Sequence, residues 1–188
     1  TATGAAAAGE TKTELPLIVR VYDVVLPVKP HLRTAFGLTT RYRRLQGANP
    51  AENLESVMRY SKFLLSHRVT PLLYGTNDRG AAPPPTQRDD GTWDFSGTDR
   101  FLSEFVPLGL TSFYTFEGAG TPAYAAHLKE KGWHAMSFVY MYDEAHMREL
   151  PAMISQYTNM RAQVPDAPIL QVGWSPTKPL EGLVNIWC

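Results

Sequence analysis

The sequence is poor in cysteine, since Cys188 is the only one among 188 residues. A single thiol excludes an internal disulfide and any metal site that is built from several thiolates. Net charge is also lacking, because 18 Lys and Arg residues are balanced by 18 Asp and Glu residues. With no basic excess and no basic run, a nucleic-acid partner is not expected.

Long apolar runs are missing as well. A bilayer-spanning helix needs ~20 apolar residues, and no unbroken run approaches that length, so no membrane span is predicted. The five histidines show no metal-ligand spacing, and we expect neither a metal nor a cofactor. With 44% hydrophobic and 11% aromatic residues, the composition is sufficient for one domain with a sizeable core, or one domain and a piece of another.

The N-terminal part differs in composition from the rest of the sequence. Residues 1–10 are small and weakly polar, and we interpret residues 1–14 as a linker or a disordered end. Residues 15–27 (LPLIVRVYDVVLP) are rich in Val, Leu and Ile and partly alternate, which predicts a β-strand. Because no similar strand lies nearby in the sequence, we expect residues 15–30 to be a strand and linker from an upstream β domain.

From His31 onward, strand and helix patterns alternate. Proline at the first helical position, after Asn49 and after Thr121, marks two helix starts. The predicted strands are 31–38, 69–74, 110–116, 135–142, 169–172 and 184–187. Two of the predicted helices begin at Pro50 and Pro122, and two others cover 98–106 and 151–164. Such alternation predicts an α/β fold in which helices cover a parallel sheet.

Two parallel architectures compete for residues 31–188. A doubly wound sheet needs a glycine-rich turn after its first strand, and Phe36-Gly37-Leu38 provides no further glycine. A (β/α)8 barrel carries polar and aromatic residues at the carboxyl ends of its strands, as this sequence does. We therefore expect an incomplete barrel of about six strands, completed by a C-terminal segment or by a partner chain, because a full barrel needs ~250 residues.

Two adjacent acids follow the fourth predicted strand, in Tyr140-Met141-Tyr142-Asp143-Glu144. Most glycosidases take their two carboxyl groups from different strands. Neighbouring acids at one strand end suit substrate-assisted hydrolysis, in which the 2-acetamido oxygen of the sugar attacks C1. One carboxylate then orients the acetamide N–H, and the other acts as general acid and base.

Four stretches carry a more specific resemblance: 15–27 (LPLIVRVYDVVLP), 93–101 (WDFSGTDRF), 140–144 (YMYDE) and 184–188 (VNIWC). Together they resemble the N-terminal portion of the catalytic domain of family 123 glycoside hydrolases, which are β-N-acetylgalactosaminidases. The resemblance implies Glu144 as the general acid/base and Asp143 as the residue that stabilises the acetamide. It also implies a glycan substrate with terminal β-linked N-acetylhexosamine, expected to be N-acetylgalactosamine, and it favours an extracytoplasmic setting.

Five further residues are candidate substrate contacts. Trp174 and Trp187 end two predicted strands and offer aromatic faces on which a sugar ring can stack. Glu117 ends another and offers hydrogen bonds to hydroxyl groups, while Tyr140 and Tyr142 are placed to contact the acetamide. Each also has a structural interpretation, as a core aromatic or as a loop cap.

Two alternatives stay open. Asp143 and Glu144 are also the residue types that cap a helix and occupy its first turn. The chain as a whole can be a non-catalytic structural or glycan-binding module on a truncated glycosidase barrel. Because six strands cannot close an eight-stranded barrel, hydrolysis by this chain alone is left open.

Overall fold

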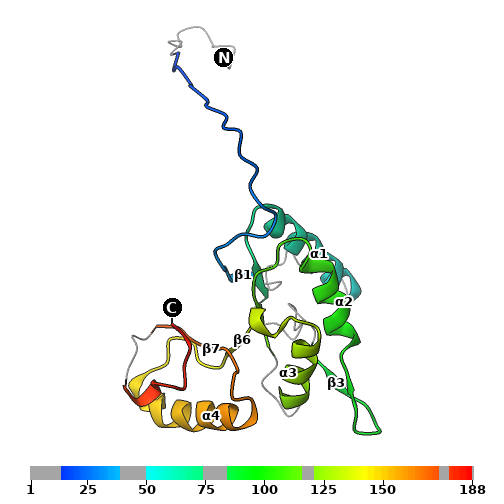
Figure 1. Cartoon of the computed structure of the whole chain (residues 1–188), viewed down its shortest axis with the longest axis vertical. Coiled ribbons are helices and arrows are strands. Elements are labelled where there is room, and N and C mark those ends of the chain that lie inside the picture. Colours follow the sequence, from blue (N-terminus) through cyan, green and yellow to red (C-terminus); the bar gives the residue numbers. More distant parts are fainter. Residues whose placement is uncertain (1–13, 39–49, 74–83, 116–120, 174–177, 188) are drawn as a thin grey trace.

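A computed structural model describes residues 14–38, 50–73, 84–115, 121–173 and 178–187, and it contains a mixed α/β fold (Figure 1). The α-helices are α1 (Pro50–Ser66), α2 (Ser96–Phe105), α3 (Thr121–Glu130) and α4 (Leu150–Gln163). The strands are β1 (Phe36–Leu38), β2 (Pro71–Leu73), β3 (Thr86–Gln87), β4 (Trp93–Asp94), β5 (Phe113–Tyr114), β6 (Ser137–Tyr140), β7 (Ile169–Gln171) and β8 (Ile186–Trp187). Short 3-10 turns are η1 (His134–Met136), η2 (Met147–Glu149) and η3 (Lys178–Leu180).

The principal sheet is parallel and has the strand order β5-β6-β7-β8. Neighbours in the sheet are also neighbours in the chain, and α3, α4 and η3 make the three crossovers. A second parallel pair is formed by β1 and β2, which α1 connects. The α/β class with a parallel sheet, predicted from the alternating pattern, is therefore confirmed.

Threonine side chains connect the two parallel sheets just before their strands begin. The hydroxyl oxygens of Thr70 and Thr111 are 2.7 Å apart, and the Thr111 amide donates to the Thr70 hydroxyl at 3.2 Å. The Thr70 amide in turn donates to the Thr34 hydroxyl at 2.9 Å. Hydrogen bonds to these threonine hydroxyls thus hold the amino ends of β1, β2 and β5 side by side.

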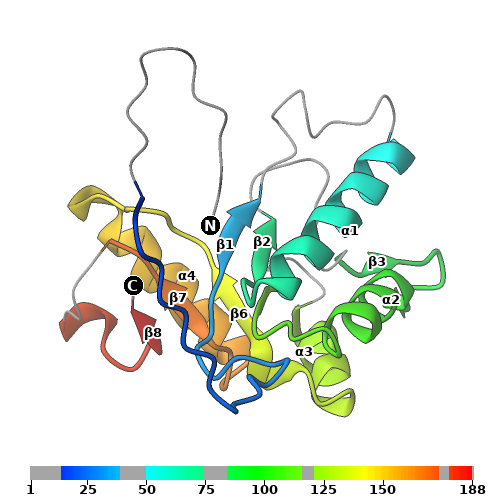
Figure 2. The same cartoon turned by 90° about the horizontal axis from the view of Figure 1, so that it is seen from above.

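The core consists of two apolar clusters. The first lies among α1, α2 and α3 and is centred on Leu102, Phe105 and Phe113. The second lies beneath α4, where Met153 and Tyr157 pack on Ile169 of β7. Both views place α4, β7 and β8 on one side of the molecule and α1, α2 and α3 on the other (Figures 1 and 2).

The helices follow their sequence patterns closely, whereas the strands are shorter than predicted. The inward residues expected for 98–106 are buried in α2, and α3 begins at Thr121, one residue before the predicted first helical position. The strand predicted over 110–116 is reduced to β5, and that over 135–142 to β6. The antiparallel hairpin of β3 and β4 was not predicted, because its short strands lack an alternating apolar pattern.

The strand predicted over 15–27 does not form within the described chain. Its large apolar side chains are exposed, with Val21 at 91% and Val25 at 92%, and the segment leads away from the body (Figure 1). A strand requires the edge of a neighbouring strand, and no described segment supplies one to these residues. Its assignment to an upstream β domain stays a prediction. Over the ranges the model describes, no helix combines the length and apolar character needed to cross a bilayer.

Candidate functional site

The two adjacent acids lie on the loop that follows β6, at the carboxyl end of the parallel sheet. Asp143 and Glu144 are both exposed. The cap of the next helical turn is His146, whose amide donates to the Glu149 carboxylate at 2.6 Å. Asp143 and Glu144 therefore do not cap η2 or α4, and the capping interpretation of these acids is wrong for this fold.

Asp143 is held by a tyrosine at the end of the preceding strand. The Tyr140 hydroxyl donates a hydrogen bond to Asp143 Oδ1 at 2.5 Å. Side chains alternate along β6, and Val139 belongs to the cluster beneath α4, so Tyr140 points to the opposite face of the sheet. A hydrogen bond from a hydroxyl to a carboxylate is among the stronger types, so it fixes one oxygen of Asp143 in place.

Glu144 has an unusual backbone conformation. Its φ angle is 45°, in the left-handed region that non-glycine residues seldom adopt. The reason is local: Asp143 is exposed while Ala145 is buried in the second cluster, and the turn at Glu144 takes the chain inward. Within the described residues the Glu144 carboxylate has no hydrogen bond or ion pair. Strained residues without a structural partner are enriched at functional sites.

Trp187 lies on the other face of the sheet from Tyr140. In the β7–β8 register it is opposite Gln171, whose side chain accepts a hydrogen bond from Tyr157 of α4 at 2.5 Å. Residues that are opposite each other in a ladder share a face, and Trp187 packs against the cluster beneath α4. This packing favours the structural interpretation of Trp187 as a core aromatic, and its contact with a sugar stays a prediction.

Tyr142 also lies toward α4. Its ring is 6.0 Å from that of Tyr157 in an edge-on arrangement, with an interplanar angle of 88°, and it packs against the same apolar cluster. Of the predicted substrate contacts, Tyr140 alone is joined to Asp143 by a described hydrogen bond. Glu117 and Trp174 lie outside the described residues.

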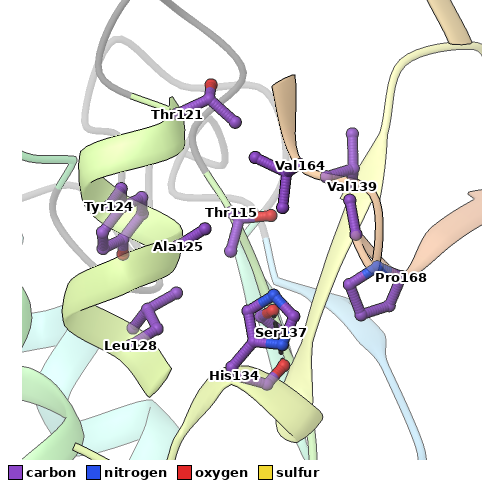
Figure 3. Close-up of a pocket in the computed structure, with 11 residues that line it drawn as sticks. Thr115, Thr121, Tyr124, Ala125, Leu128, His134, Ser137, Val139, Val164 and Pro168 are labelled. Atoms are coloured by element: carbon purple, nitrogen blue, oxygen red, sulfur yellow. Dashed lines mark hydrogen bonds between the residues drawn. The ribbon is translucent and has the colours of Figure 1, made fainter. Parts of the chain in front are cut away.

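Two cavities lined by described residues lie away from the two acids. One, of about 20 Å³, lies between α3 and β6 and is lined by Thr115, His134 and Ser137 among others (Figure 3). That volume holds roughly one water molecule, and burial lowers the pKa of His134 there. The other is an open groove of about 380 Å³ beside Val28 and Arg68, at the amino ends of the strands. Neither includes Asp143 or Glu144.

Sequence reasoning found the two acids but missed the residue that packs against Glu144. Gly173 follows β7, and a Cβ atom there would lie 3.2 Å from Glu144 Cα. A glycine just after a strand was visible in the sequence, but its neighbour across the sheet was not. Among the described residues no group of three or more His, Cys, Asp or Glu side chains is placed to hold a metal ion. No protein-family model matches this sequence, and no curated protein matches it either.

Proposed function

We propose that this chain is part of a (β/α)8 glycoside hydrolase that removes terminal β-linked N-acetylhexosamine, with N-acetylgalactosamine as the expected sugar. The reaction is substrate-assisted and retains the anomeric configuration. Glu144 is the general acid and base, and Asp143 orients the acetamide group. The partner is a glycan or glycoconjugate, and no cofactor takes part.

The strand order supports the barrel part of the proposal. In β5-β6-β7-β8 each strand pairs with its successor in the chain, with no reversal of order. A doubly wound sheet reverses its order at a switch point, whereas a barrel adds strands in sequence. The side-chain bonds between Thr70 and Thr111 place β2 beside β5, which extends the same order.

The chemistry assigns one task to each acid. In the first step the acetamide oxygen bonds to C1 while the bond from C1 to the leaving oxygen breaks, and Glu144 donates its proton to that oxygen. Asp143 accepts a hydrogen bond from the acetamide N–H and offsets the positive charge of the oxazolinium. Water then attacks C1, Glu144 removes its proton, and the acetamide is regenerated.

The observation that carries the proposal is the position of the two acids at a strand end, together with the unusual local structure of each. Both are exposed at the carboxyl end of β6, where parallel-sheet enzymes bind their ligands. One is held by the Tyr140 hydroxyl, and the other keeps a left-handed backbone that a glycine or asparagine would adopt at lower cost. A merely structural loop has no need of a glutamate in that conformation.

The test is hydrolysis of an aryl β-N-acetylgalactosaminide by the full chain and by Glu144→Gln. We expect kcat/KM to fall by about 10²–10⁴-fold, the usual contribution of a general acid/base. Glu181→Gln is the matched control, because Glu181 is an exposed acid beside η3, and it should hydrolyse at the wild-type rate. Wild-type turnover by Glu144→Gln would refute the assignment.

A non-catalytic glycan-binding module is the second candidate. The observation that favours it is that neither described cavity is lined by Asp143 or Glu144. Binding of N-acetylgalactosamine by the wild-type chain without hydrolysis would favour the module. A thiazoline that mimics the cyclised intermediate should bind competitively only if the enzyme proposal is correct.

A further inference from the structure

Gly173 supports Glu144 from the neighbouring strand. It follows β7, has a φ angle of +80°, and lies against the backbone and side chain of Glu144. A Cβ atom at position 173 would be 3.2 Å from Glu144 Cα, 3.4 Å from its Cγ and 3.6 Å from its Cβ. The first of these distances is tighter than side chains normally tolerate, so an alanine there would displace Glu144.

The contact joins two elements whose relative position is already fixed. β6 and β7 are paired through Val139 with Ile169 and Tyr140 with Leu170. Glu144 lies on the loop that follows β6, and Gly173 lies just after the end of β7. A group that is held from a paired strand is positioned more accurately than one held by its own loop alone.

We propose that Gly173 is a positioning residue for Glu144, which keeps the left-handed turn and the carboxyl group of Glu144 in place through close backbone packing. Its missing side chain is the feature that matters. This inference rests on the proposed function, since it assigns Gly173 to the site in which Glu144 is the acid and base. Gly173 itself touches no reacting atom.

The chain offers two matched controls. Gly132, after α3, has a φ angle of +73°, and Gly182, after η3, has one of +76°. Both lie in the same left-handed region as Gly173, but a Cβ atom at either would meet nothing within 4 Å. Alanine at these positions introduces the same backbone strain without a collision. The controls therefore distinguish an effect of strain at the substituted glycine from an effect of displacing Glu144.

The first readout is the backbone conformation of Glu144, measured by NMR couplings that report φ in the full chain. We expect the φ angle of Glu144 to shift in Gly173→Ala and to keep its wild-type value in Gly132→Ala and Gly182→Ala. A wild-type φ of Glu144 in Gly173→Ala would overturn the inference, as would an equal shift in all three variants.

The second readout is the hydrolysis of an aryl β-N-acetylgalactosaminide. Misplacement of a catalytic group by about 1 Å costs ~10²-fold in rate. The collision at position 173 calls for a shift of a few tenths of an ångström, so kcat of Gly173→Ala should fall by roughly 3–10-fold while KM changes little. The two controls should keep the wild-type kcat. An unchanged kcat in Gly173→Ala would also overturn the inference. If the wild type hydrolyses nothing, the proposed function fails, and the NMR result still decides whether Gly173 positions Glu144.

A double variant covers the case in which Gly173→Ala does not fold. Glu144→Gly removes the Cβ and Cγ atoms that the new methyl group meets, and the freer glycine backbone can move its Cα atom away from that methyl group. Gly173→Ala with Glu144→Gly should therefore fold even where Gly173→Ala alone does not. Where the single variant folds, the urea midpoint of this pair should exceed that expected from the sum of the single effects, whereas Gly132→Ala with Glu144→Gly should be additive. Additivity in both pairs, or an unfolded double variant, would contradict the proposal.

Discussion

Two residues other than glycine have left-handed backbones in the described chain, and they differ in what their side chains do. Arg68 has a φ angle of 59°, and its guanidinium donates to the carbonyl oxygens of Leu26 and Pro27 at 3.1 Å. Glu144, at 45°, has no such partner among the described residues. The strain at Arg68 is thus offset by hydrogen bonds, and the strain at Glu144 is not.

This difference predicts opposite responses to asparagine, which tolerates the left-handed region. Glu144→Asn should raise the free energy of unfolding by about 0.5–1 kcal/mol, part of the 1–2 kcal/mol that a left-handed residue costs, while it abolishes hydrolysis. Arg68→Asn is the control and should not gain stability, because it loses two hydrogen bonds. Urea unfolding measures both, and a Glu144→Asn protein less stable than the wild type would contradict the argument.

A buried tyrosine makes the stability of the fold depend on pH in the alkaline range. Tyr124 of α3 is 1% exposed, and burial raises its pKa to about 12. The unfolded chain releases this proton near pH 10. The free energy of unfolding is therefore unaffected by this group below about pH 10. It falls by about 3 kcal/mol in total as the pH rises from 10 to 12, because the unfolded chain loses the proton while the folded chain keeps it.

The check on Tyr124 is urea unfolding at several pH values from about 9 to 12. Tyr124→Phe cannot ionise at this position, so its stability should fall less over that interval than that of the wild type. Equal losses in the two proteins would show that the phenol does not set the alkaline limit.

At the scale of elements, one arginine fastens the last described strand to the fold. Arg161, near the end of α4, donates to the carbonyl oxygens of Leu183 and Ala167 at 2.8 and 2.7 Å, and also to the Asn185 side chain. The Asn185 side chain in turn accepts from the Ile169 amide at 3.0 Å. α4, β7 and the approach to β8 are thus held by one planar guanidinium.

Arg161→Lys should therefore loosen β8 selectively. A lysine keeps the charge but cannot reach several acceptors in one plane, and we expect a loss of about 2 kcal/mol in the free energy of unfolding. Amide exchange at Asn185, which donates to the Ile169 carbonyl at 3.1 Å, should accelerate more than exchange in α2. Arg148→Lys, at an exposed arginine of η2, is the control. Uniform acceleration across both regions would contradict a local role.

Helices were the elements that the sequence predicted best, because their evidence is local. Thr121-Pro122 and the spacing of Phe101, Leu102 and Phe105 specify a helix start and a buried face without reference to the rest of the fold. Strand lengths and register depend on partners far away in the sequence. The face on which Trp187 lies is set by its pairing with Gln171, which no local pattern reveals.

For the molecule as a whole, the sequence predicted the α/β class and the place of the acids at a strand end, but not the contacts around them. The Tyr140 bond to Asp143 and the packing of Gly173 on Glu144 join positions 3 and 29 residues apart, and only the second needs the folded sheet. The exposed apolar residues of 15–27 show the same dependence on distant contacts. Their pattern predicts a strand, but it does not indicate which other strand they pair with.

The most direct test of the central claim compares aryl β-galactosaminides whose 2-acetamido group carries no, one, two or three fluorine atoms. Fluorine withdraws electrons from the acetamide oxygen, and in the proposed mechanism this oxygen attacks C1. We predict that kcat of the wild-type chain falls steeply with each fluorine and that the 2-hydroxy analogue is not hydrolysed. Equal rates across the series would show that the sugar is not its own nucleophile and would contradict the roles given to Asp143 and Glu144.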